Sequence, residues 1–160
     1  MCFPRAWITL GAKLAARGIQ PRVANHSTTD SLADEVIRRY RAGGRGAVVI
    51  IGHSLGADAA VEMAQRLNEA RVPVALVVGF GPTRSFDLPP NVVRAVNYYH
   101  GYTPWRGRVQ NVNMDSMQGV NHFNVDKVER LQDQTVSQVL AAIGGGRRSA
   151  SQSQAVSPRM

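Results

Sequence analysis

The residues with the clearest chemical potential form one short stretch, "GHSLG" at residues 52–56, which directly follows the apolar run "AVVII" at residues 47–51. Its spacing is G-x-S-x-G, in which a serine is exposed on a sharp turn between a buried strand and a helix. Small residues two positions before and after the serine, here Gly52 and Gly56, let strand and helix pack closely. Ser54 is therefore a candidate nucleophile.

A helix is expected to begin directly after this serine. From Leu55 to about Glu69, apolar residues recur at helical spacing. The free N–H groups and the dipole of a helix N-terminus favour negative charge. We therefore expect the backbone N–H of Leu55 to stabilise an oxyanion formed at Ser54. The alternative, a phosphate-binding turn, normally needs more glycines or a Gly-Lys-Ser/Thr ending, and the stretch has neither.

The elements that must position this turn alternate along the chain. Strands are predicted at residues 19–24, 47–51, 74–80, 92–99 and 109–114. Helices are predicted over residues 6–17 with Gly18 as the stop, over 31–41, over 55–69, and from about Asn124 onwards. Strands separated by helices of about 10–16 residues predict an α/β fold, with a mostly parallel sheet flanked by helices on both sides.

The chain divides at one compositional boundary. Residues 1–143 carry the alternating elements and are predicted to form one domain. Residues 144–160 are rich in Gly, Ser, Gln and Arg, with little to bury, and are predicted to be a disordered basic tail.

The apolar run followed by "GHSLGAD" resembles the nucleophile elbow of the α/β-hydrolase fold, of the lipase, esterase and thioesterase type. The resemblance covers about residues 6–143 in the order of the elements. It implies a serine hydrolase that acts on a small-molecule carboxylic ester or thioester through a Ser-His-Asp mechanism. No metal or organic cofactor is expected, because the chain has neither a Cys/His cluster nor a dinucleotide-binding glycine pattern.

The serine needs a base, because its hydroxyl stays protonated at neutral pH. The histidines are His26, His53, His100 and His122. His53 is the chain neighbour of Ser54 and is not expected to face the hydroxyl. His122 lies between the last predicted strand and the last predicted helix, where members of the α/β-hydrolase family place the catalytic histidine. We therefore predict His122 as the base, with His100, at a strand end, as the alternative.

The acid that completes such a triad is missing from both places where the family resemblance implies it. In many members it follows the next strand but one after the elbow, and residues 96–107 contain no Asp or Glu. In triglyceride lipases it follows the next strand in a Gly-Leu-Asp-Pro pattern. The corresponding residues here are "GFGP" at 79–82, with Gly81 in place of the aspartate.

Two other carboxylates remain as candidates for the acid. Asp115 ends the strand before His122, and Asp87 lies in the loop after Gly81. We favour Asp115 slightly. Asp126 is interpreted as stabilising the dipole of the last helix, and Asp58 as a solvent-facing or locally paired residue of the elbow helix.

The N-terminal part also departs from the α/β-hydrolase pattern. Members usually have strands before the first helix, and a loop after one of them donates the second oxyanion N–H. Here only residues 2–6 precede or open the first helix, which indicates either a minimal version or a truncated chain. A missing strand would leave a sheet edge free, which favours a homodimer. We expect a cytoplasmic protein if the start is natural, and the single Cys2 fits a reducing compartment.

Charge and hydropathy argue against two classes of partner. The formal net charge is +8, but the arginines are scattered and do not alternate with aromatic residues. This pattern favours a solvated surface over nucleic-acid binding. The sequence has no apolar run of about 18 residues, so no stable membrane insertion is expected. The competing hypothesis for function is a binding module of the same fold that has lost its acid and its oxyanion loop.

Overall fold

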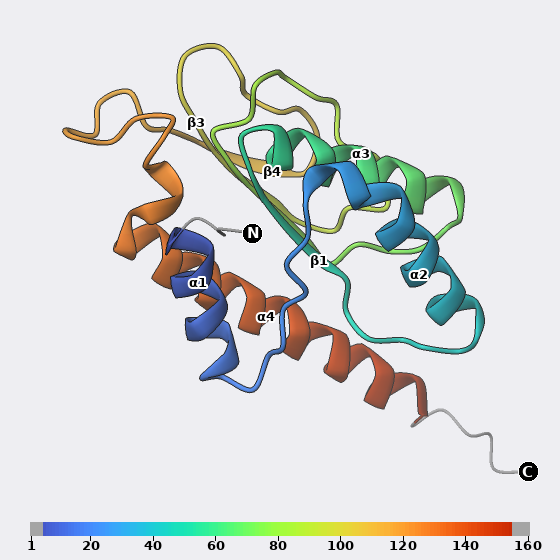
Figure 1. Ribbon diagram of the computed structural model, residues 1–160. Helices are drawn as coiled ribbons and strands as arrows, with labels where there is room; N and C mark the ends of the chain where they lie inside the picture. Colours follow the sequence, from blue (N-terminus) through green and yellow to red (C-terminus); the bar gives the residue numbers. More distant parts are fainter. Residues whose placement is uncertain (1–4, 155–160) are drawn as a thin grey trace, which may run out of the picture.

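The protein, described here by a computed structural model over residues 5–154, is built around one parallel sheet (Figure 1). Its strands lie in the order β1-β2-β3-β4 and are all parallel. They are β1 (Val49–His53), β2 (Leu76–Phe80), β3 (Ala95–Tyr99) and β4 (Val109–Asn113). The predicted α/β class with a parallel sheet is confirmed.

The strand register places the ends of the first three strands side by side. His53 pairs with Phe80, and Phe80 pairs with Tyr98. Every residue of β2 is buried, because helices cover the sheet on both faces. This two-sided burial explains why the central strand is an apolar run rather than an alternating one.

Four helices flank the sheet in the described residues, two on each face (Figure 1). They are α1 (Arg5–Ala15), α2 (Thr29–Arg41), α3 (Leu55–Glu69) and α4 (Glu129–Gln154), and two short 3₁₀ helices are η1 (His26–Thr28) and η2 (Val125–Lys127). The apolar sides of α2 and α3 pack on one face with Val77 of β2. Those of α1 and α4 pack on the other face with Val78 and Phe80.

The connections between the strands are of two kinds. Only the β1–β2 connection contains a helix, α3, among the described residues. The two later connections are loops, and Phe86 and Trp105 from these loops fill the core on the α3 side. A Cβ on Gly79 of β2 would lie 2.3 Å from the Trp105 ring. The indole therefore packs directly on the sheet, where a crossover helix would otherwise cover it.

The predicted strand at residues 19–24 is wrong, since the described chain has no strand there. The predicted stop at Gly18 is correct, with a positive φ of 77°. The N–H of Ile19 donates to the carbonyl oxygen of Leu14, which completes the end of α1. The N–H of Ile19 therefore belongs to the helix end and not to a strand. The segment that follows is a coil up to η1.

At the other end, α4 continues to Gln154, past the predicted boundary at residue 143. Helical hydrogen bonds are satisfied within the segment itself, so a helix can continue where there is little to bury. Residues 2–4, including Cys2, and residues 155–160 lie outside the described part, and the domain boundary stays a prediction. None of the described helices is long and apolar enough to cross a membrane.

Candidate active site

Ser54 occupies the turn between β1 and α3 in a strained backbone conformation, with φ 57° and ψ −123°. Such an angle is uncommon for a residue with a side chain and persists only where the surroundings hold it. Its N–H donates to the carbonyl oxygen of Phe80 at 2.9 Å, and its own carbonyl accepts from the N–H of Ala57 at 2.9 Å. The turn is thus fastened to the next strand on one side and to the first turn of α3 on the other.

The close approach expected at both glycines of the turn is found at Gly52 alone. A Cβ on Gly52 would lie 2.0 Å from the carbonyl oxygen of Gly56, which no side chain can tolerate. A Cβ on Gly56 would meet nothing within 4 Å. The strand must therefore carry a glycine before Ser54, whereas the helix has room for a side chain at residue 56.

The structure brings the hydroxyl of Ser54 and the ring of His122 together. Ser54 Oγ lies 2.9 Å from His122 Nε2, across 68 positions of sequence. His122 belongs to the loop between β4 and η2. Its pKa lies below the usual value, chiefly because of burial and then because of His53 and His100, while Asp126 and Asp58 act in the opposite direction. A neutral imidazole at this place can accept the proton of a serine hydroxyl.

The other ring nitrogen of His122 faces backbone rather than a carboxylate. A Cβ on Gly81 would lie 3.1 Å from His122 Nδ1. Gly81 has a positive φ of 57°, and its N–H donates to the carbonyl oxygen of Tyr98 at 2.7 Å. Within the described residues, no hydrogen bond joins Nδ1 of His122 to a carboxylate. Gly81, where the resemblance to triglyceride lipases implies the acid, therefore lies beside His122 but has no side chain.

Asp115, the acid favoured from the sequence, lies beside a different histidine. Its carboxylate accepts from the N–H of Gly101 at 3.0 and 3.1 Å, and it lies 3.3 Å from His100 Nδ1. The Gly101 hydrogen bond is the main cause of the lowered pKa of Asp115. β3 and β4 are neighbours and end side by side, so a carboxylate that follows β4 reaches the loop after β3. The described contacts do not join it to His122.

Asp87, the second candidate acid, is on the surface. Its carboxylate forms an ion pair with Arg106 at 2.5 Å, and both side chains are 73% exposed. Hydrogen bonding by Arg106 lowers the pKa of Asp87. The pair links the β2–β3 loop to the β3–β4 loop, beside a bridge between the same two residues. This explains Asp87 as a loop contact.

Two residues near the base were assigned other roles from the sequence. His53 Nε2 donates to the backbone oxygen of His122 at 2.7 Å, and its Nδ1 lies 3.8 Å from Asp126 Oδ2. Asp126 was expected to stabilise the dipole of the last helix, but it is buried in η2, before α4 begins at Glu129. The only sequence signal for this contact was a carboxylate four residues after His122.

Asp58, expected to face solvent or pair locally, is buried. It accepts a hydrogen bond from the N–H of Thr83 at 3.0 Å and another from the Thr83 hydroxyl. Both bonds tie α3 to the loop after β2, which also carries Gly81. Asp58 therefore holds together two of the segments that surround Ser54 and His122.

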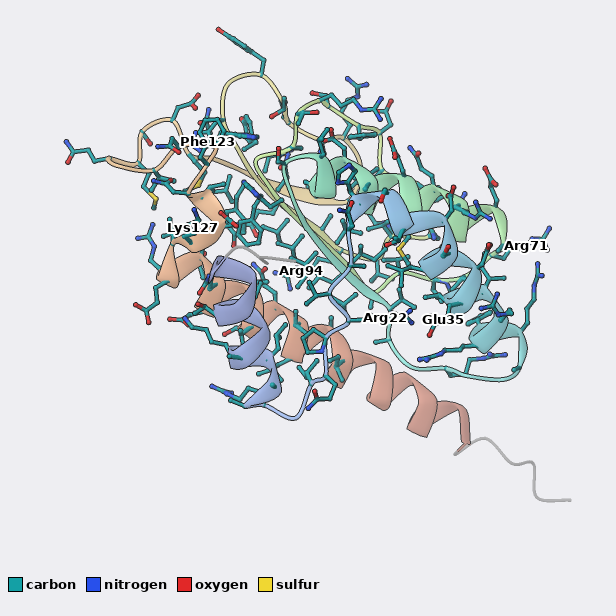
Figure 2. All side chains as sticks on the ribbon, in the orientation of Figure 1. Arg22, Glu35, Arg71, Arg94, Phe123 and Lys127 are labelled. Carbon is teal, nitrogen blue, oxygen red and sulfur yellow. The ribbon has the colours of Figure 1, made fainter. Side chains whose placement is uncertain are left out.

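The apolar side chains that follow the two central residues are exposed. Leu55 is 54% exposed and Phe123 is 77% exposed. Figure 2 shows Phe123 at the upper left, among the loops at the carboxyl edge of the sheet. The ring of His122 meets that of Phe123 edge-on, with 5.3 Å between centroids. The candidate site thus has an apolar rim formed by these two side chains.

Two grooves of the described structure lie away from these residues. One, of about 770 Å³, lies between α4 and the strands β3 and β4, and another, of about 390 Å³, between α2 and α3. Neither is lined by Ser54 or His122. In the described part of the chain, no group of three or more His, Cys, Asp or Glu side chains is arranged to hold a metal ion.

Comparison with known proteins gives one finding. A family model described as "Thioesterase domain" matches residues 4–91, slightly more than half of the chain. The matched part runs from α1 through β2 and includes Ser54, Leu55 and both glycines of the turn, and it ends before His122. No curated protein and no solved structure gives a match.

Proposed function

This chain belongs to the thioesterase-domain family, an α/β-hydrolase-type family, and we propose that it hydrolyses a carboxylic ester or thioester with Ser54 as the nucleophile and His122 as the base. The observation that carries the proposal is the 2.9 Å contact between Ser54 Oγ and His122 Nε2. Nucleophile and base within hydrogen-bond reach are the signature of an activated serine.

The proposed reaction has two halves. Ser54 Oγ attacks the carbonyl carbon of the substrate while its proton passes to His122 Nε2. The tetrahedral oxyanion accepts a hydrogen bond from the N–H of Leu55, at the N-terminus of α3. Collapse of this intermediate breaks the bond to the alcohol or thiol, which leaves with the proton from His122. Water, deprotonated by His122, then attacks the acyl-enzyme and releases the carboxylic acid and free Ser54.

The surroundings of the two residues suit this chemistry. A lowered pKa keeps His122 neutral near pH 7, in the form that accepts a proton. The exposed apolar side chains of Leu55 and Phe123 favour a substrate whose acyl group is apolar. A thioester and an oxygen ester have the same carbonyl geometry, so we propose both leaving-group classes.

The competing proposal is a binding module that has lost catalysis. It is favoured by Gly81, which leaves His122 Nδ1 without a carboxylate on that side. Retention of the strained turn at Ser54 argues against it, since backbone strain of this kind costs stability of about 1–3 kcal/mol. The two proposals differ in whether Ser54 is reactive.

Covalent labelling with a fluorophosphonate, read by intact mass, tests the proposal. We expect wild type to gain one adduct, and Ser54→Ala and His122→Ala to gain none or to react far more slowly. Ser137→Ala, which removes an exposed serine of α4, is the matched control and is expected to react like wild type. Failure of the folded wild type to react would refute the hydrolase and favour the binding module.

A homodimer and a cytoplasmic location stay predictions. In the described sheet β1 pairs only with β2, so one edge of β1 is free of strand partners and is the place where a second copy would pair. Light scattering over a concentration series distinguishes monomer from dimer.

A further inference from the structure

His53 connects the strand that carries the nucleophile to the loop that carries the base. Its Nε2 donates to the backbone oxygen of His122 at 2.7 Å. Because His53 directly precedes Ser54, this bond helps to set the distance between base and nucleophile. The rings of His53 and His122 lie 5.6 Å apart and are tilted by 37°. The structural contact between His53 and His122 is therefore the backbone hydrogen bond and not ring stacking, and His53 in addition lowers the pKa of His122.

The second ring nitrogen of His53 faces a buried carboxylate. Nδ1 lies 3.8 Å from Asp126 Oδ2, and Asp126 is only 5% exposed. The other oxygen, Oδ1, is buried without a hydrogen-bond partner in the described structure. A buried carboxylate is costly unless it is paired, and the group that faces it at 3.8 Å is Nδ1 of His53. A carbonyl oxygen thus faces one nitrogen of His53, and a carboxylate oxygen faces the other.

The base meanwhile lacks the partner that a triad normally supplies. An acid in that position holds the imidazole in place and stabilises the cation that forms during the reaction. On the Nδ1 side of His122 the neighbour is Gly81, which has no side chain to supply a carboxylate. Residues other than a carboxylate at Nδ1 must therefore hold the imidazole in place and stabilise its cation.

We propose that the His53–Asp126 pair performs these two tasks in place of a carboxylate on His122 Nδ1. His53 holds the base through its backbone carbonyl, and Asp126 supplies negative charge near the imidazolium formed when Ser54 loses its proton. Both are positioning residues, since neither exchanges a proton with substrate or nucleophile. The proton passes from Ser54 Oγ to His122 Nε2 and then to the leaving group. The inference rests on the proposed function.

The test uses ester hydrolysis by the full chain, with p-nitrophenyl butyrate as the probe. Asp126→Asn removes the charge at nearly equal volume. His53→Gln keeps an N–H donor near the position of Nε2 but loses the contact with Asp126. We expect each to lower kcat by about 10-fold, equivalent to a loss of about 1.4 kcal/mol of transition-state stabilisation, with KM changed by less than about twofold. His53→Ala is expected to lower kcat more than His53→Gln does, because only glutamine keeps an N–H donor for the backbone oxygen of His122.

A double variant and a charge control separate positioning from general destabilisation. If the pair acts as a unit, Asp126→Asn combined with His53→Gln costs no more than the worse single change. Asp133→Asn removes one exposed carboxylate of α4 that pairs with Lys13, and it is expected to keep the wild-type kcat. Circular dichroism confirms that each variant is folded. Additive losses in the double variant, or equal losses in the control, would overturn the pairing.

A second readout does not depend on activity. The titratable groups around His122 are His53 at the end of β1, His100 after β3, Asp58 in α3 and Asp126 in η2. Proton NMR of the His122 ring is expected to give a lower titration midpoint in Asp126→Asn than in wild type, because a stabilising negative charge is lost.

The outcomes of the inference and of the proposed function are distinguishable. If wild type reacts with the fluorophosphonate but both single variants keep its kcat, the inference is wrong and the hydrolase stands. If wild type does not react, the hydrolase is refuted. The NMR titration midpoint of the His122 ring then still decides whether Asp126 acts on His122. An unchanged midpoint in Asp126→Asn overturns the inference in either case.

Discussion

The two glycines of the serine turn provide the sharpest test of the fold around the site. A Cβ on Gly52 would lie 2.0 Å from the carbonyl oxygen of Gly56. The van der Waals contact distance for these atoms is about 3.2 Å, so the strand and the start of α3 must separate by about 1 Å. Both groups are backbone, so no side chain can move aside. Overpacking of this kind costs about 1–3 kcal/mol, and we expect Gly52→Ala to lie at or above the upper end.

Gly56→Ala, at the second residue of α3, is the matched control. Its Cβ meets nothing within 4 Å, and alanine is favoured over glycine in a helix by about 0.5–1 kcal/mol. We therefore expect this variant to be as stable as wild type or slightly more stable. The pair of variants adds the same methyl group four residues apart, with opposite expected signs.

Urea unfolding followed by circular dichroism measures both variants. With a slope of about 2 kcal/mol per molar urea, a loss of 3 kcal/mol lowers the midpoint by about 1.5 M. Separation of strand and helix also moves Ser54 Oγ away from His122 Nε2, so we expect slower labelling by the fluorophosphonate for Gly52→Ala. Equal midpoints for Gly52→Ala and wild type would refute the close approach and the packing argument based on it.

Four further predictions concern the base and the rim. Because burial lowers the pKa of His122, we expect the rate of fluorophosphonate labelling to rise with pH, with a midpoint below the usual histidine pKa of about 6.5. A pH midpoint at or above that value would contradict the effect of burial. The same shift makes stability depend on pH, because the folded state binds this proton less readily than the unfolded state. The stability contributed by neutral His122 is present above about pH 6.5 and is lost as pH falls through the pKa of the folded state. Urea unfolding midpoints of wild type and His122→Ala between pH 5 and 8 measure this effect. Gly81→Asp places a carboxylate beside His122 Nδ1, at a positive φ of 57° that aspartate tolerates better than most residues. We expect a higher NMR titration midpoint for His122 in this variant than in the uncharged control Gly81→Asn. Equal midpoints would show that the side chain points elsewhere. Phe123→Ala removes an exposed apolar side chain at the rim, so KM is expected to rise more for an octanoyl than for an acetyl ester; an equal change for both would remove Phe123 from acyl binding.

The helices and strands nearest Ser54 were predictable because their causes are local. The helical periodicity after Ser54 predicted α3 with its observed bounds, Leu55–Glu69. The apolar run before the turn predicted a buried strand, but β1 lies two residues further along, at Val49–His53, and only Gly52 of it is fully buried. Such patterns arise from repeats of 3.6 and 2 residues within one segment. Contacts across the fold are not needed to produce them.

The surroundings of His122 could not be derived in the same way. The bond from His53 to His122 joins residues 69 positions apart, and Asp115 meets Gly101 only because β3 and β4 are neighbours. The sequence placed several carboxylates after strands, but which of them reaches a given histidine depends on loop paths and strand order. The sequence also did not show that Phe86 and Trp105, from the loops after β2 and β3, would cover the sheet there.

By itself, the sequence determined the serine turn, the helix behind it, the parallel sheet and the histidine to be tested as base, because each is encoded by residue types within a short stretch. Only the tertiary structure decided that Gly81 lies against His122 Nδ1 and that Asp126 lies beside His53. These are contacts between segments, and their distances depend on how the whole core packs. The charge environment of the base is therefore a property of the fold and not of any motif.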